Sequence, residues 1–258
     1  MHESRVHTKI ILGAALLVAF AACSEAPARS VPDPTSTADL AVAGGASYPP
    51  LSPTDLAARA EVIAEVEVID VKPSVTNTAD GGFPDAAQLT AKAENGHPLA
   101  GLTVSTPVEV RVLEVLSVAP RVTFPTGDEM VIYVAGGTVT ATLDETQARL
   151  LGVSTVDEAE DLDRPQPEVP VTGPVDITWG QAPSVVLVEG GTYVVFLAER
   201  DLPSYTGASS KRAWRLGHPA DVWERSPDGW KPQASLRDGQ SAIAADLDEM
   251  VVLVRNGP

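Results

Sequence analysis

Hydrophobic and polar residues alternate with a period of two over several short stretches of the chain, which predicts strands buried on one face. The clearest stretches are EVIAEVEVIDV at 61–71 and PVEVRVLEVL at 107–116, and EMVIYVA at 129–135 is predicted as a third strand. In the second stretch the alternation slips near Leu113, which indicates a β-bulge or strong coiling. The stretch TYVVFLA at 192–198 has apolar residues on both faces. We therefore expect this last strand to be central in its sheet.

Pairs of glycines predict tight turns between strands, because Gly adopts positive φ without steric cost. The pair at 136–137 is expected to turn the chain so that 138–143 returns beside the preceding strand. The pair at 190–191 is expected to form the same kind of turn between 184–188 and the central strand.

Short helices are predicted where a capping residue stands three positions before an acidic or amide residue. The sequence SPTD at 52–55 begins such a helix, with Pro at its first position, and 56–60 continues it. The segments 144–147 and 155–158 have the same pattern, and Gly152 is expected to end the first of these two helices.

The C-terminal part is expected to contain a loop, a hairpin and a last strand. The Pro-rich segment 163–183 is predicted to be a loop. The turn residues at 227–229 predict a hairpin that brings Trp223 and Trp230 close together. The apolar run 251–254 is interpreted as a strand.

The fold class that these elements favour is all-β, a small barrel with short decorating helices, because closure removes exposed strand edges. Segments 55–72, 106–137 and 184–216, with the runs ARAEVIAEVEVIDV, TPVEVRVLEVL and VEGGTYVVFLAE, resemble secreted barrel domains of OB or netrin-like type. Such domains are common in actinobacterial lipoproteins of unknown function, so the resemblance implies a fold more than an activity.

The domain organisation expected from the sequence has one folded part. Residues 52–258 are predicted to form a single β-barrel-like domain with loop insertions at about 73–104 and 143–183. No internal repeat is visible.

The N-terminus has the organisation of a signal peptide at 1–22, with a weakly basic start followed by an apolar run. The run 10–22 would form a helix of only ~20 Å, too short for a hydrocarbon core of ~30 Å. The sequence FAAC at 20–23 resembles the lipobox of bacterial lipoproteins, which implies that the thiol of Cys23 carries a diacylglycerol. The alternative is an ordinary secretory signal in which Cys23 is incidental. Residues 23–51, rich in Pro, Ala, Ser and Thr, are interpreted as a disordered tether.

Composition and charge exclude a wholly disordered chain, an intramolecular disulfide and some classes of partner. The chain is 44% hydrophobic and 21% charged, which excludes a wholly disordered protein. Its formal net charge is -17, which argues against nucleic acid and other polyanions as partners. The nearest basic cluster, Lys211, Arg212 and Arg215, is interpreted as a solvated strand end. Since Cys23 is the only cysteine, an intramolecular disulfide is excluded.

No motif predicts a catalytic residue, a metal ligand or a cofactor. The chain lacks the G-x-S-x-G sequence of a nucleophile elbow and any pair of histidines four residues apart. His97 and His218 each precede a proline and are interpreted as surface residues. The acidic segment 157–163 is interpreted as a solvated helix, with adventitious calcium binding as an alternative.

Four aromatic residues near the C-terminus are the candidate ligand-binding residues: Tyr205, Trp214, Trp223 and Trp230. One interpretation is a cross-strand pair of tryptophans that plugs the end of the barrel. The other is an exposed platform for a protein or glycan ligand, because indole faces stack on sugars and proline.

The function expected from these features is that of a lipid-anchored lipoprotein on the extracytoplasmic face of the cell membrane. It would act as a non-enzymatic binding or interaction module. The alternatives are a cell-wall hydrolase and a secreted protease-inhibitor-like domain. The inhibitor would need a free amine at Cys23 to bind zinc, whereas acylation of Cys23 removes it.

Overall fold

The computed structural model of this protein is mostly β-sheet with a few short helices. It describes residues 9–11, 38–42, 51–120, 122–124, 127–156, 168–170, 172–179, 185–207, 210–227, 229–233 and 247–256.

The chain divides into two compact units where the sequence predicts one domain. Unit 1 comprises 1–43, 84–100 and 140–178, and unit 2 comprises 44–83, 101–139 and 179–258. The segments predicted as loop insertions, about 73–104 and 143–183, thus supply much of unit 1.

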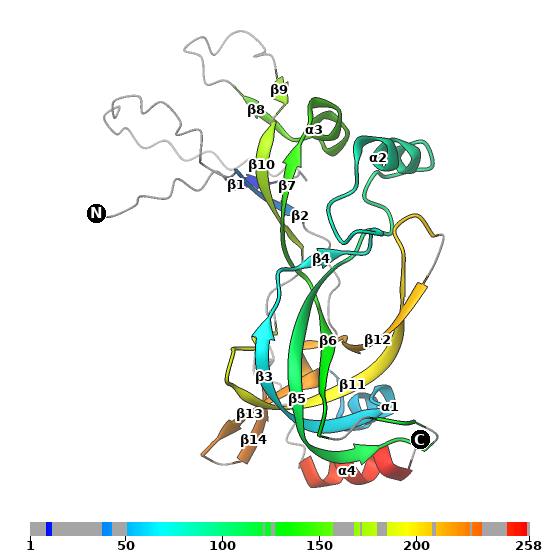
Figure 1. Ribbon diagram of the computed structural model, residues 1–258, viewed down its shortest axis with the longest axis vertical. Helices are drawn as coiled ribbons and strands as arrows, with labels where there is room; N and C mark the ends of the chain where they lie inside the picture. Colours follow the sequence, from blue (N-terminus) through cyan, green and yellow to red (C-terminus); the bar gives the residue numbers. More distant parts are fainter. Residues whose placement is uncertain are drawn as a thin grey trace, which may run out of the picture. The chain divides into compact units, whose positions relative to one another are not determined.

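Unit 2 is built on one large sheet (Figure 1). Its strands are β3 (Val62–Val71), β4 (Val75–Thr76), β5 (Val104–Val118), β6 (Glu129–Ala135), β11 (Thr192–Pro203), β12 (Ser210–Leu216), β13 (Val222–Ser226) and β14 (Gly229–Pro232). The order is β12-β6-β5-β3-β11-β13-β14, with β4 paired to β5 and with β12 paired to β11 as well. The β12–β6 pair is parallel, and the neighbouring pairs are antiparallel. The sheet continues through β13 and β14 and is not a closed barrel.

The predicted strands of unit 2 are largely confirmed. Strands β3 and β6 coincide with the strands predicted at 61–71 and 129–135, and β11 lies between β3 and β13 as a central strand should. The slip near Leu113 is a register shift, because Glu65 pairs with Glu114 while the next residue, Val66, pairs with Val112. Leu113 therefore has no partner across the β3–β5 ladder. The hairpin of β13 and β14 is confirmed by its pairing.

The helices of unit 2 are α1 (Pro53–Arg59), the 3-10 helix η1 (Pro219–Asp221) and α4 (Leu247–Asn256). The predicted capping box of α1 is confirmed, since Asp55 N–H donates to the Ser52 hydroxyl. The strand predicted at 251–254 is wrong, because this segment belongs to α4. Met250 and Val254, four residues apart, are both buried, so the helical spacing places them on one buried face.

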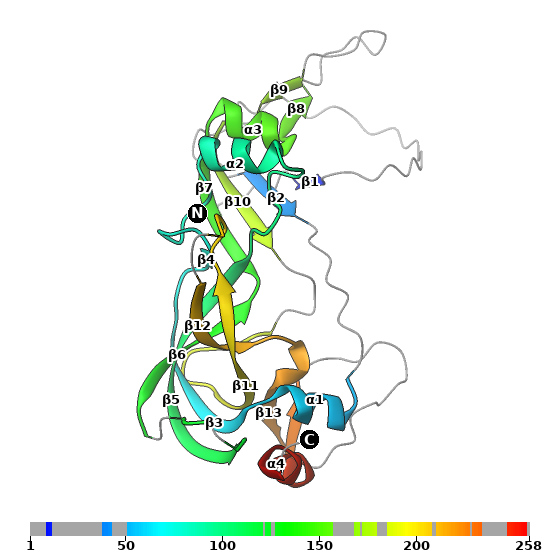
Figure 2. The ribbon, with the colours of Figure 1, turned by 90° about the vertical axis from the view of Figure 1, so that its right-hand side faces the viewer.

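The large sheet of unit 2 has two apolar cores. Alternate residues of β3 and β11, such as Val66 and Val195, join β5 and β6 side chains in the first core. The intervening residues Ile63 and Phe196 join the second core with α1, η1, β13 and α4. Figure 2 shows α1 and α4, which contact each other, covering this second core. Because β11 contributes side chains to both cores, both of its faces pack against apolar residues.

The described residues of unit 1 form two helices and two small sheets. The helices α2 (Ala86–Ala93) and α3 (Glu145–Leu151) both have capping boxes and contact each other. The first sheet has the order β1 (Lys9–Ile11), β2 (Ala38–Val42), β10 (Gly173–Trp179), β7 (Gly137–Leu143), and the second pairs β8 (Ser154–Val156) with β9 (Glu168–Pro170). The end of α3 at Gly152 is confirmed, because Gly152 caps it with φ 65.

The glycine turn predicted at 136–137 is wrong, because β7 pairs with β10 and not with β6. The two glycines permit close packing instead. A Cβ on Gly137 would lie 2.1 Å from the Ser74 Oγ atom, and the Thr106 hydroxyl donates to the Gly136 carbonyl at 3.0 Å. The segment at 185–188 is not a strand either, although the Gly191 N–H donates to the Val188 carbonyl in a turn.

Two further predictions in the inserted segments are wrong. The helix expected to begin at 155–158 does not begin at Thr155, because Thr155 and Val156 belong to β8, whose residues pair with β9, while 157–158 lie outside the described residues. The segment 163–183 is not a loop throughout, since its described part includes β9 and β10. The acidic segment 157–163 lies outside the described residues.

The predicted signal peptide 1–22 and Cys23 lie outside the described residues, apart from β1. Of the predicted tether 23–51, the structure describes Leu51 and 38–42, and 38–42 forms β2. Among the described residues, no helix has the length and apolar character needed to span a bilayer.

Candidate functional site

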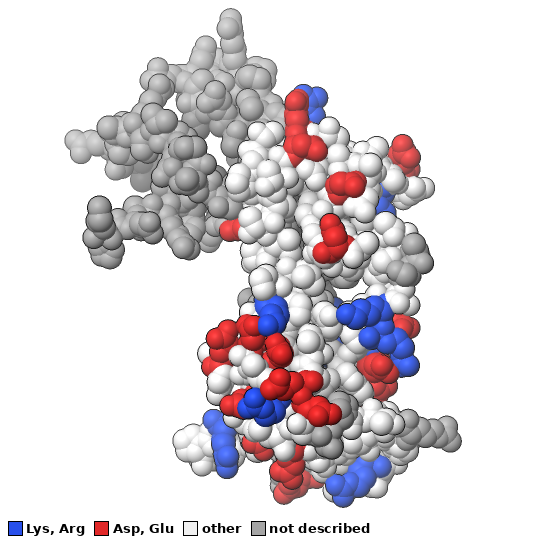
Figure 3. Space-filling model, viewed as in Figure 1, with Lys and Arg blue, Asp and Glu red and all other residues white. Residues whose placement is uncertain are grey.

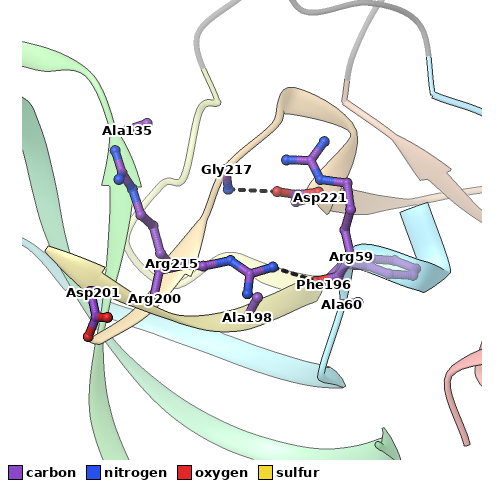
Figure 4. Close-up of a pocket in the computed structure, with 10 residues that line it drawn as sticks. All are labelled: Arg59, Ala60, Ala135, Phe196, Ala198, Arg200, Asp201, Arg215, Gly217 and Asp221. Carbon is purple, nitrogen blue, oxygen red and sulfur yellow. Dashed lines mark hydrogen bonds between the residues drawn. The ribbon is translucent and has the colours of Figure 1, made fainter. Parts of the chain in front are cut away.

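Unit 2 contains a pocket of about 440 Å³ on which α1, β6, β11, β12 and η1 converge (Figure 4). This volume lies in the range of small-molecule sites. The lining residues are Arg59, Ala60, Ala135, Phe196, Ala198, Arg200, Asp201, Arg215, Gly217 and Asp221. Three arginines among ten lining residues distinguish this pocket from a purely apolar cavity.

Arg59 enters the pocket from the last turn of α1. The backbone of Gly217 leaves room for its guanidinium, because a Cβ at that position would lie 3.2 Å from the Arg59 Nη2 atom. Figure 4 shows this side chain beside Gly217 and Asp221. The absence of a side chain at 217 therefore shapes the pocket around Arg59.

Arg200 and Arg215 come from the paired strands β11 and β12, where Ala198 is opposite Arg215 and Arg200 is opposite Ala213. The Arg200 guanidinium donates from Nη2 to the Arg59 carbonyl at 3.1 Å, which places it beside the end of α1. The Arg215 side chain turns toward Ala135 instead (Figure 4). The two arginines begin close together, and their guanidinium groups diverge.

Asp221 is the buried acid of the pocket, with 5% of its surface exposed. Its Oδ2 atom accepts the backbone N–H groups of Gly217 at 2.7 Å and His218 at 2.6 Å. Burial raises the pKa of Asp221 to about 6, opposed by the charges of Arg59 and Arg200 and by these two hydrogen bonds. The carboxyl group is therefore ionised at pH 7 and protonated in mild acid.

The balance of charge in the pocket is positive, since its lining includes three guanidinium groups and two carboxylates, those of Asp221 and Asp201. Asp201 also lies 4.0 Å from the Arg212 Nε atom, outside the pocket lining. The lining also includes the apolar side chains of Ala60, Phe196 and Ala198. Guanidinium groups bind carboxylates and phosphates through two parallel hydrogen bonds, so this arrangement is suited to an anionic ligand.

Some cations elsewhere on unit 2 are paired with acidic side chains. Lys72 pairs with Glu109 at 3.0 Å, and Arg111 pairs with Glu67 at 2.8 Å and with Glu129 at 3.0 Å. Figure 3 shows Asp and Glu side chains gathered over β3 and β5, with Lys and Arg among them. The acidic surface and the arginine-lined pocket are thus different environments on one unit.

The basic cluster Lys211, Arg212 and Arg215 is divided by the alternation of β12. Lys211 and Arg212 are exposed, and Arg212 pairs with Glu199 at 2.8 Å. The Lys211 ammonium donates to the Tyr133 hydroxyl at 3.1 Å. Arg215 is half-buried and lines the pocket, so interpreting all three as one solvated strand end is wrong for this residue.

The four aromatic residues predicted as a ligand site do not form one exposed surface. Tyr205 and Trp223 are fully buried, and the Trp223 indole donates to the Ala220 carbonyl at 2.9 Å. Trp214 is half-buried and packs edge-to-face on Phe124, with 4.9 Å between ring centroids. Trp230 is half-buried, with the Arg225 guanidinium 5.7 Å from its ring centroid. A role for Trp214 or Trp230 in binding a ligand stays a prediction.

Trp223 and Trp230 are not opposite each other in the hairpin, since Trp223 pairs with Pro232 and Trp230 with Arg225. Both nevertheless belong to the second core. Trp223 packs on Phe196, with 5.5 Å between ring centroids. Because Phe196 also lines the pocket, Trp223 supports a pocket wall from the core side.

His97 of unit 1 and His218 of unit 2 differ in their surroundings. His97 is exposed, as expected, whereas His218 is buried, so the surface interpretation is wrong for it. Its Nδ1 atom accepts the Ala220 N–H at 2.9 Å as the cap of η1. Within the part of the chain that the structure describes, no group of three or more His, Cys, Asp or Glu side chains could hold a metal ion.

Sequence reasoning missed Arg59, Arg200 and Asp221. The arginines are far apart in the sequence, and only the pairing of β11 with β12 and the end of α1 bring them together. Asp221 had a local signal, because HPAD at 218–221 repeats the cap, proline and acid spacing of SPTD at 52–55.

Comparison of the chain with protein families, with curated proteins and with solved structures finds no match. The fold and the pocket are therefore the grounds on which a function is argued.

Proposed function

We propose that the protein is a non-enzymatic binding module, displayed on the extracytoplasmic face of the membrane, and that its pocket on unit 2 binds a small anionic molecule. The observation that carries this proposal is the convergence of Arg59, Arg200 and Arg215 on one pocket with apolar walls. In a chain of net charge -17, such a concentration of cations is selective for a small anion, because the acidic surface repels polyanions such as nucleic acid.

The location is proposed from the leader. The FAAC sequence at 20–23 supports acylation of Cys23, and two or three acyl chains hold a protein far more firmly than one. The lipid on Cys23 would be the contact of this protein with the membrane.

A finer assignment of the fold, as an OB or netrin-like barrel, is also proposed. Its support is that β12 pairs with both β6 and β11, so β3, β5, β6, β12 and β11 are joined in a circuit of pairings. The register of the parallel pair places Leu216 opposite Val134. An OB-fold is a partly open barrel, so amide-to-amide contacts between these two strands in an NMR spectrum would support this assignment, and their absence would contradict it.

One observation favours the hydrolase alternative. The pKa of Asp221, raised by burial to about 6, would allow it to donate a proton. Glycoside hydrolysis uses a pair of carboxyl groups, and the other carboxylate that lines the pocket, Asp201, lies beside Arg212. Because both backbone hydrogen bonds of Asp221 serve the cap of η1, we favour a structural role for it and binding as the function.

The proposal is tested by thermal stability in the presence of anions. The full chain, purified in neutral detergent, is expected to melt at a higher temperature with millimolar carboxylates than with chloride, since a ligand of the folded state stabilises it. Arg59→Met should abolish this increase, whereas Arg149→Met, on α3 of unit 1, should retain it. An identical melting temperature in all the anions would contradict the proposal.

A further inference from the structure

We infer that the natural ligand is a dianion with two separated acid groups on a short apolar frame, such as a dicarboxylic acid. This inference rests on the proposed function, because it names the chemical class of the ligand that the same pocket binds.

The pocket has two positive poles. Arg59 and Arg200 form the first, because Arg200 donates to the Arg59 carbonyl and both side chains act electrostatically on Asp221. Arg215 forms the second, since its side chain turns toward Ala135 on β6 (Figure 4). The divergence of Arg200 and Arg215 from paired strands separates the poles.

The pocket also has apolar lining residues. Ala198, opposite Arg215 on β12 and two residues from Arg200 on β11, contributes hydrophobic surface between the poles, and Ala60 and Phe196 contribute it beside Arg59 (Figure 4). Trp223 packs behind Phe196 and supports this lining from the core side. A hydrocarbon frame loses water against such a lining, whereas a polar frame such as a sugar would lose hydrogen bonds. The arrangement is therefore suited to an acid group at each pole with methylene groups between them.

A single compact anion fits less well. Inorganic phosphate placed between Arg59 and Arg200 would leave Arg215 without a role in binding, and phosphate placed at Arg215 would lose the first pole. The Asp221 carboxylate also repels a compact dianion near Arg59 at pH 7, because it already offsets part of the positive charge of Arg59 and Arg200. A diacid carries one negative charge at each end, so each acid group can pair with the arginines of one pole.

The experiment is titration calorimetry at pH 7 on the full chain in neutral detergent. The probes are succinate, glutarate and adipate, with butyrate as the matched monoacid and inorganic phosphate as the compact anion. At least one diacid should bind roughly 10- to 100-fold more tightly than butyrate, since a second charge-assisted contact is gained. Arg215→Met should weaken diacid binding to the level of butyrate, because the second charge-assisted contact is lost.

The control variant is Lys211→Met, which removes a cation from the same strand outside the pocket and should change no affinity. Arg215→Lys keeps the charge and should retain part of the diacid preference. If butyrate or phosphate binds as tightly as every diacid, the dianion inference is overturned while the proposed function stands. If none of the probes binds and Arg59→Met shows no effect on melting, both are overturned. Because the probe series uses the unmodified chain, the test does not depend on any variant folding.

Discussion

The Asp221 Oδ2 atom accepts the backbone N–H of His218 at 2.6 Å, and the His218 ring accepts the N–H of Ala220 at 2.9 Å. These reciprocal hydrogen bonds form the cap of η1, which places Asp221 on the pocket wall. A single short helix thus fixes a buried acid beside Arg59 and Arg200. The charge of that acid affects both the stability of unit 2 and the electrostatics of its pocket.

The first prediction concerns the dependence of stability on pH. Because the folded-state pKa of Asp221, about 6, is above its ordinary value of 3.8, the folded chain binds the proton more tightly than the unfolded chain. The contribution of Asp221 to the free energy of unfolding should therefore fall as the pH rises from about 4 to about 6, by roughly 3 kcal/mol in all. Above that window it should stay constant.

Asp221→Asn is expected to remove this slope and to be at least as stable as the unmodified chain at pH 7. The Asn carbonyl oxygen can accept the same two N–H groups without the buried charge. Urea denaturation at pH 4.5 and 7 measures the effect, with Asp201→Asn as an exposed control that should retain the slope. Equal slopes in the Asp221→Asn variant and the unmodified chain would show that Asp221 does not titrate in this window.

The second prediction concerns Gly217→Ala. The new Cβ would lie 3.2 Å from the Arg59 Nη2 atom, so the guanidinium must move by a few tenths of an ångström. We expect a few-fold loss of anion affinity with little change in melting temperature, measured by calorimetry with glutarate. Gly82→Ala is the matched control, because its Cβ would contact only Asp80 at an ordinary distance of 3.5 Å. Unchanged affinity in Gly217→Ala would mean that Arg59 does not contact the ligand.

The sequence predicts the local features of the fold well and its long-range features poorly. Alternation places β3, apolar runs place β6 and β11, and capping residues place α1 and α3, because these signals lie within a few neighbouring residues. The error at 251–254 comes from an apolar run too short to show its period. The helical period becomes visible only when Met250 is included, because Met250 and Val254 are four residues apart.

The candidate site could not be predicted for a related reason. Arg59, Arg200 and Arg215 each look like an ordinary charged residue at the end or edge of an element. Their convergence depends on β12 pairing with β11 and on the contact of Arg200 with the Arg59 carbonyl. The pair Gly136 and Gly137 illustrates the same limit, since sequence alone does not distinguish a turn from close packing against Ser74.

The third prediction concerns the lipid anchor. Cys23→Ala should not be labelled by a palmitate analogue and should leave the membrane fraction, because no other thiol is present in the chain. Ser24→Ala, the neighbouring control, should be labelled normally. If Cys23→Ala is still found in the membrane fraction, residues 10–22 hold the chain there instead.

The last prediction separates the core role of the aromatic residues from a ligand role. Trp223 is fully buried, packs on Phe196 and donates to the Ala220 carbonyl, so Trp223→Ala should lower the free energy of unfolding by ~3 to 5 kcal/mol. Trp230 is half-buried at the second core, so Trp230→Ala should cost clearly less and should leave anion affinity unchanged. Denaturation and glutarate binding measured on both variants test these expectations.

The two tryptophans serve as controls for each other, because they lie in one hairpin and belong to one core. A glycan and peptide array probed with the unmodified chain and with Trp230→Ala adds the test of a stacking role. A glycan or peptide bound by the unmodified chain and lost in the stable Trp230→Ala variant would assign a second ligand to unit 2. A large loss of stability in Trp230→Ala, equal to that of Trp223→Ala, would instead show that the half-buried indole contributes to the core as much as the buried one.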